Sequence, residues 1–438
     1  MTKIPPSAGR LLLAAACVAG VCLAVRSLQQ GRTKGDWSDA SRQWEVCQYV
    51  KARINPYELA FRLLRDTFGP ATGPNRVLLR ETRIYSISAA RWDENTPGVL
   101  PGHPPPEATY PPSTMSMLMP TIGFLPKPLL LPVYTLANAV FLILLVGLLS
   151  AWFAKETRLP KATSWTAVAA LCLLWPPLQY ALQNGQAGIL ALLCALGAML
   201  LLDRSPWAAG ALLMVALIKP SMVLLYFFIP LVRWKWKPLW TVFFLGVILT
   251  VLPSFWLREW PWVLIEQWMG LCRYVLQGSF TVQEVLNALA WENTPQGTAV
   301  VLLIWGGTLA WCALHRRARW EEQFAFLSLA NLAWTYHERH DFVLLVFPLV
   351  LFAARLVRPG RRTPAVLGLG LGLVLGLAIS DFFYVPATGW ANAMRWAGRL
   401  SLPGLFILTA LGVRTSHREE ISAGAPTATG TADRPRRP

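Results

Sequence analysis

Residues 35–58, GDWSDASRQWEVCQYVKARINPYE, are a polar stretch that directly follows the first apolar segment of the chain. The stretch carries two aspartates, Asp36 and Asp39, and it ends in Asn-Pro-Tyr at residues 55–57. Most of the chain that follows is made of long apolar runs. A carboxylate held against such a bundle and shielded from bulk water is a candidate general base.

Apolar positions recur at spacings of three and four between residues 40 and 54, and they are Val46, Cys47, Val50 and Ile54. This periodicity predicts an amphipathic helix lying on the membrane surface. Asn55-Pro56 ends it, because the residue before a proline avoids the α region.

Asp39 has two interpretations that both stay open. Aspartate is a favoured N-cap, so Asp39 fits the start of this helix, with Asp36 one turn earlier. Alternatively, one of the two carboxylates takes a proton from an acceptor hydroxyl. The spacing to residues 55–57 favours Asp39 over Asp36 for this second role.

The composition predicts an all-α integral membrane protein with many spans. Hydrophobic residues make up 54% of the 438 residues and charged residues only 14%, against about 25% in a typical soluble domain. The formal charge of +17 comes largely from Lys and Arg in short loops between apolar runs, which the positive-inside rule explains better than nucleic-acid binding does. The seven cysteines show no CxxC spacing, so neither a disulfide framework nor a metal site is expected.

Run lengths and flanking Lys and Arg residues predict about twelve spans, some of them short or broken, with both termini cytoplasmic. Pro176-Pro177 must bend the span at 164–182. The runs at 206–218 and 221–232 are each too short to cross alone. One continuous helix would place the basic cluster after them outside, whereas two short helices meeting at Lys219-Pro220 place it inside, and the second interpretation is preferred.

The chain is expected to divide into a first transmembrane helix (1–28), a long extracytoplasmic loop bearing interfacial helices and the candidate base (29–128), a multi-pass transmembrane bundle (129–413), and a disordered cytoplasmic tail (414–438).

Polar groups without an evident topological role fall on the extracytoplasmic side, and each has a structural alternative. Tyr110, before two prolines, fits a rigid helix start or an aromatic wall for a sugar. Asn184 and Gln186 fit a tight turn or hydrogen bonds to sugar hydroxyls. Lys219 fits snorkelling to the surface or an ammonium facing a lipid phosphate.

The late polar stretch adds His337, Arg339, His340 and Asp341. Two histidines three residues apart are a weak metal signal. Surface solvation and contact with a phosphate or sugar are the other interpretations.

These motifs in order resemble glycosyltransferase family 87, membrane enzymes of the GT-C class that are similar to α-1,2-mannosyltransferases. The resemblance rests on Asp39 with Trp44 and the Asn-Pro-Tyr at 55–57, on Tyr110-Pro111-Pro112, Gly185-Gln186 and Lys219-Pro220, and on the stretch at 336–341. A tyrosine pair usual after the aspartate is absent here.

The resemblance implies a GT-C helical bundle that transfers a hexose, commonly mannose, from a polyprenyl-phosphate-linked donor to a lipid or glycan acceptor. It further implies inversion at the sugar carbon, an aspartate base on the extracytoplasmic face, and no cofactor. The competing hypothesis is a lipid or sugar transporter, or flippase, without transferase activity.

Overall fold

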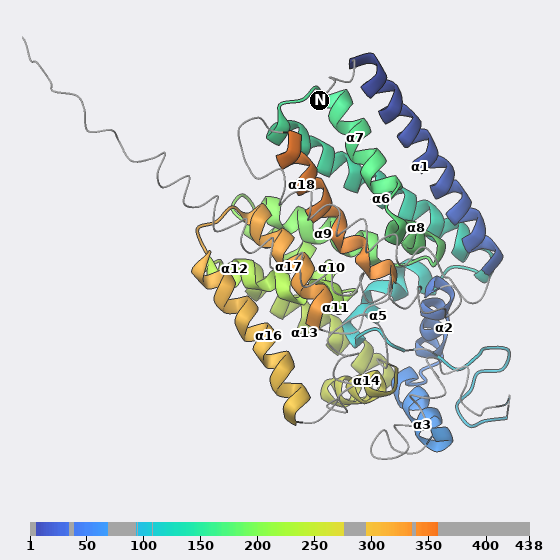
Figure 1. The fold of residues 1–438 in the computed structure, drawn as a ribbon. Helices are drawn as coiled ribbons and strands as arrows, with labels where there is room; N and C mark the ends of the chain where they lie inside the picture. The colour runs from blue at the N-terminus through green and yellow to red at the C-terminus, as the bar shows by residue number, and fades with distance from the viewer. Residues whose placement is uncertain are drawn as a thin grey trace, which may run out of the picture.

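Figure 1 shows the computed structural model, which describes residues 6–34, 39–68, 93, 95–106, 108–275, 295–334 and 339–357. Every regular element in these residues is a helix, as the all-α prediction requires. The helices before the bundle are α1 (Pro6–Lys34), α2 (Asp39–Lys51), α3 (Pro56–Phe68), α5 (Pro112–Leu118) and the short π-helix η3 (Met119–Gly123).

The bundle follows η3 along the chain (Figure 1). Its elements are α6 (Lys127–Thr157), α7 (Lys161–Leu173), α8 (Pro176–Gln183), α9 (Gly188–Leu201), α10 (Pro206–Ala216), α11 (Pro220–Val223), η4 (Leu224–Phe227), α12 (Phe228–Val232), α13 (Trp236–Leu257), α14 (Pro261–Val275), α16 (Pro295–Leu314), α17 (Trp320–Trp334), η5 (Arg339–Leu345) and α18 (Val346–Val357).

Four helical stretches in the described residues are long and apolar enough to cross a membrane: α6, α13, α16 and His340–Val357. A fifth is counted if α7 and α8 are one span, bent by 68° where the sequence places Pro176-Pro177. The expected total of twelve is not confirmed. The runs expected at 364–380 and 400–413, and the tail at 414–438, lie outside the described residues.

Other apolar helices are shorter than a bilayer needs. For example, α9 has 14 residues, which span about 21 Å against a hydrocarbon thickness of about 30 Å. Its buried side chains show that neighbouring helices cover it. Such short helices depend on the bundle, which is why run length alone is a poor guide to their role.

The segment between α9 and α13 leaves one side of the bundle and returns to it. Lys235 Nζ lies 2.9 Å from Asp203 Oδ1, so the residues before α10 and after α12 are neighbours. Between them the backbone breaks at Lys219-Pro220 into α10 and the α11–α12 piece. This is the arrangement of two short helices that the sequence favoured.

The prediction of a surface helix at 40–54 is wrong for α2. Both faces of this helix are covered, with Gln43, Trp44 and Glu45 as deeply buried as the apolar residues. Its charged side can be buried because Glu45 Oε2 contacts His103 Nδ1 at 2.5 Å and its Oε1 contacts Lys127 Nζ at 3.3 Å. In Figure 1, α2 lies below the end of α1 and above α3.

In contrast, α3 is an amphipathic helix with Leu59, Leu63 and Leu64 buried. These residues share a second, smaller core with Leu264 and Leu271 of α14. The main core lies among the helices from α6 to α18. The small core holds the residues before the bundle against its end, and α2 connects the two.

Candidate active site

Asp39 is the first residue of α2. Its backbone N–H donates to Asn184 O at 3.1 Å, and its carboxylate accepts a hydrogen bond from Gln186 Nε2. A carboxylate in the first turn of a helix is favoured by the positive end of the helix dipole. The start of α2 is therefore held against the turn between α8 and α9.

That turn has the shape to receive α2. Gly185 adopts φ +61°, where a side chain would be strained. A Cβ at Gly185 would also lie 3.3 Å from Ala40 Cβ and 3.5 Å from Tyr134 Cδ1. Glycine thus lets the backbone of the turn approach both α2 and α6 while Gln186 points its amide at Asp39.

Lys219 fixes the orientation of that amide. Its Nζ donates to Gln186 Oε1 at 2.8 Å and also to Asp341. An ammonium has donors only, so it must take the oxygen of the amide and leave the nitrogen for Asp39. Asp39 in turn must act as an acceptor, which the ionised carboxylate does best.

The far end of this chain of contacts is at the start of η5. Asp341 is 2% exposed, and His340 Nε2 lies 3.3 Å from Asp341 Oδ1. A carboxylate buried this deeply needs a cation and hydrogen bonds, and Lys219 supplies the cation. We refer to Asp39, Gln186, Lys219, His340 and Asp341 together as the Asp39 cluster.

Tyr110 borders the Asp39 cluster just before α5. Burial raises the pKa of its phenol well above the ordinary value, and the carboxylate of Asp39 raises that pKa further. The phenol therefore stays protonated at neutral pH and can donate a hydrogen bond. Its backbone carbonyl accepts one from Tyr57 Oη at 2.8 Å.

The Asn-Pro-Tyr at residues 55–57 is a structural brace for this side of the site. Asn55 Oδ1 accepts hydrogen bonds from the backbone N–H groups of Tyr57 and Glu58 at 3.1 and 3.2 Å, which caps α3. Asn55 Nδ2 donates to Gln267 Oε1 at 2.7 Å. Together with the Tyr57 contact, the tripeptide ties α3 and α14 to the segment that carries Tyr110.

A sequence model of glycosyltransferase family 87 matches residues 108–380. The chain belongs to this family. It is therefore a glycosyltransferase, and its apolar helices make it a membrane protein. No curated protein and no solved structure matches the chain.

The matched region of family 87 includes every member of the Asp39 cluster except Asp39 itself. Asp39 joins that region through its contacts with Asn184 and Gln186. The geometry thus connects the candidate base to the part of the chain that defines the family.

The structure brings together six of the site residues named from the sequence: Asp39, Tyr110, Gln186, Lys219, His340 and Asp341. Asn184 contributes its backbone carbonyl. Asp36, His337 and the side chain of Arg339 lie outside what the structure describes. In the described residues no group of three or more His, Cys, Asp and Glu could hold a metal ion.

Sequence reasoning missed Gln43, which is 2% exposed and lies one helical turn after Asp39. Its Oε1 accepts from Tyr134 Oη at 3.4 Å. Its Nε2 is buried and has no hydrogen-bond partner among the described residues, which costs about 1–3 kcal/mol. The spacing of four from Asp39 was the available signal, because such residues share a helix face.

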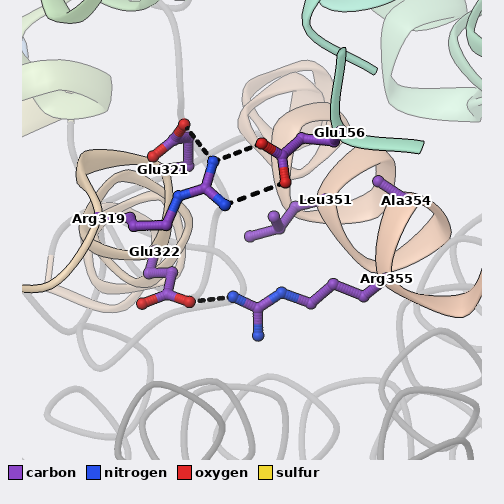
Figure 2. A pocket seen from close by; sticks show the side chains of 7 residues that line it. All are labelled: Glu156, Arg319, Glu321, Glu322, Leu351, Ala354 and Arg355. Atoms are coloured by element: carbon purple, nitrogen blue, oxygen red, sulfur yellow. Dashed lines mark hydrogen bonds and ion pairs between the residues drawn. The ribbon is translucent and has the colours of Figure 1, made fainter. Parts of the chain in front are cut away.

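A second charged cluster lies at the other end of α6, and it lines a small pocket (Figure 2). Arg319 donates to both carboxylate oxygens of Glu156, at 3.0 Å and at 2.5 Å, and to Glu321 at 2.9 Å. Arg355 binds Glu322. We refer to these five residues as the Arg319 cluster. It fastens α17 to α6 and α18.

Proposed function

We propose that this family 87 enzyme transfers a hexose, with mannose as the first candidate, from a polyprenyl-phosphate-linked donor to a hydroxyl of a lipid or glycan acceptor. Asp39 is the general base. The observation that carries the proposal is the chain of contacts from Asp39 through Gln186 to Lys219, because it makes Asp39 an acceptor and joins it through one amide to an ammonium.

The reaction is a single displacement at the anomeric carbon. The acceptor oxygen forms a bond to that carbon as the bond to the phosphate oxygen breaks, and the electron pair leaves with the lipid phosphate. The proton of the acceptor hydroxyl passes to the Asp39 carboxylate. Attack opposite the leaving group inverts the sugar carbon.

Lys219 stabilises the phosphate that departs. Its contacts with Gln186 and Asp341 use two of the three N–H groups of an ammonium, and we assign the third to the phosphate. In the late polar stretch, Arg339 or one of the two histidines, His337 or His340, contacts the phosphate, and the others, with Asp341, contact sugar hydroxyls. Tyr110 and Asn184 keep their proposed role of holding the sugar.

We place the reaction on the extracytoplasmic face, with both termini cytoplasmic. Arg316, Arg317 and Arg319 lie between α16 and α17, and the positive-inside rule assigns such a cluster to the cytoplasm. The Asp39 cluster lies at the other end of the helices that follow. The resemblance to family 87 implies that lipid-phosphate sugars are presented on this face.

The test uses the purified full chain in proteoliposomes with radiolabelled polyprenyl-phosphate mannose and octyl α-mannoside as acceptor. The wild type should release polyprenyl phosphate and form a labelled disaccharide with inverted linkage. Asp39→Asn should form none, while Asp203→Asn, a matched change in an exposed ion pair, should retain activity. Labelled donor that moves between leaflets and stays intact would instead favour a flippase.

The same assay decides between the two aspartates. Asp36→Asn should keep most of the activity if Asp39 is the base. An inactive Asp36→Asn beside an active Asp39→Asn would transfer the role to Asp36.

A further inference from the structure

Gln43 carries the strongest unexplained signal in the described part of the molecule. Its amide nitrogen is buried and has no hydrogen-bond partner there, although it sits on α2 one turn from the candidate base. Residues four apart on a helix share a face, with about 5–6 Å between their Cβ atoms. The nitrogen is therefore an available donor beside Asp39.

The surroundings of Gln43 keep its oxygen occupied. Tyr134 Oη donates to Gln43 Oε1 at 3.4 Å, and the Tyr110 phenol lies near the same side chain. Tyr134 comes from α6, and Tyr110 from the segment before α5. The Tyr134 hydroxyl holds the amide by its oxygen from a separate element, which helps to preorganise the nitrogen as a binding group.

We propose that Gln43 Nε2 donates a hydrogen bond to an acceptor hydroxyl next to the one that Asp39 deprotonates. This deepens the proposed function and rests on it. The acceptor class is then a compound with adjacent hydroxyls, such as a sugar ring or another cyclic polyol, rather than a simple alcohol. An amide N–H recognises an oxygen lone pair, so it distinguishes a hydroxyl from the hydrogen of a deoxy analogue.

The experiment compares acceptors and variants in one matrix. The acceptors are octyl α-mannoside and its 2-, 3-, 4- and 6-deoxy analogues, each with radiolabelled polyprenyl-phosphate mannose. The enzymes are the wild type, Gln43→Met and the control Gln48→Met. Gln48 is a second glutamine of α2, and it donates to Gly123 O at 3.1 Å, away from Asp39.

Two deoxy analogues should stand out with the wild type. One lacks the attacked hydroxyl and gives no product, and the other lacks its neighbour and shows kcat/KM lower by about tenfold or more. In Gln43→Met, kcat/KM for octyl α-mannoside should fall to the value that the wild type shows with the second analogue. The substitution should not lower kcat/KM for the second analogue any further. Gln48→Met should keep the wild-type preference.

Several results would overturn the inference. These are an equal loss for all acceptors in Gln43→Met, a wild type that ignores every neighbouring hydroxyl, and donor breakdown without transfer to any mannoside. Gln43→Asn, which keeps an amide but shortens it, replaces Gln43→Met if that variant does not fold, and the same loss of preference is expected. A wild type that leaves the donor intact would remove the proposed function itself.

Discussion

The Asp39 cluster and the Arg319 cluster lie at opposite ends of the same helices. Asp341 is at the start of η5 and Arg355 near the end of α18, and α6 similarly connects Tyr134 to Glu156. Each cluster has one more carboxylate than it has Lys or Arg side chains. Similar charge is nevertheless arranged in two different ways.

In the Arg319 cluster each of the three carboxylates contacts a guanidinium (Figure 2). Guanidinium is always charged and binds carboxylates through a rigid fork, which suits a permanent fastening between helices. In the Asp39 cluster a neutral amide stands between the ammonium and one carboxylate. That amide orients the Asp39 carboxylate and separates it from the Lys219 ammonium.

The largest effect is expected from Asp39→Asn, which keeps the shape of the side chain and removes its ability to take a proton. Transfer should fall by at least about 10²–10⁴-fold, the range that general-base catalysis contributes. The thermal unfolding temperature in detergent should change little, because the carboxamide can still accept from Gln186. Near wild-type turnover in this variant would mean that the Asp39 cluster, like the Arg319 cluster, only fastens helices together.

Lys219→Met should have the next largest effect, and mainly on stability. It leaves Asp341 buried without its ammonium, and breaking a buried pair in this way costs about 3–5 kcal/mol. Denaturant unfolding in mixed micelles measures that loss.

The double variant Lys219→Met/Asp341→Leu separates the two roles of Lys219. It should recover much of the stability, because no buried charge is left behind. Activity should stay low, since the Gln186 amide loses the ammonium that orients it and the phosphate loses its contact with Lys219. Recovery of activity together with stability would reduce Lys219 to a structural residue.

Arg319→Met tests the other cluster and should affect stability alone. The Arg319 side chain is 35% exposed, so water screens its ion pairs and the cost should be about 1–2 kcal/mol. Turnover should remain within about twofold of the wild type. A large loss of turnover with an intact fold would mean that this end of the bundle takes part in the reaction.

The sequence predicted the Asp39 cluster better than it predicted the fold around it. Gln186, Lys219 and Asp341 each follow or precede an apolar run, so a common side of the membrane could be deduced from run lengths and basic loops. A polar residue at such a position is conspicuous, which is why the motifs were visible.

The burial of α2 could not be deduced in the same way. Glu45 looks like a solvent-facing residue, and its partners His103 and Lys127 lie 58 and 82 positions further along the chain. Gln43 was overlooked although it stands four residues before Cys47, in line with the apolar positions of the helix. The span count is not confirmed in the described residues, where helices such as α9 are shorter than a bilayer and depend on their neighbours.

The smallest predicted effect comes from Tyr57→Phe, which removes the hydroxyl that binds the Tyr110 carbonyl. Tyr226→Phe is the matched control, because Tyr226 is equally buried and its hydroxyl pairs with Ser328 at 2.8 Å, within the bundle. Each variant should lose about 0.5–1.5 kcal/mol of stability, the net value of one hydrogen bond.

The two tyrosine variants should differ in their kinetics. Tyr57→Phe should raise KM severalfold, because the Tyr110 segment borders the Asp39 cluster and loses one of its supports. Tyr226→Phe should leave KM unchanged at an equal loss of stability. If both variants behave alike, the tripeptide at 55–57 only stabilises the fold, and the link from α3 to the Asp39 cluster has no functional consequence.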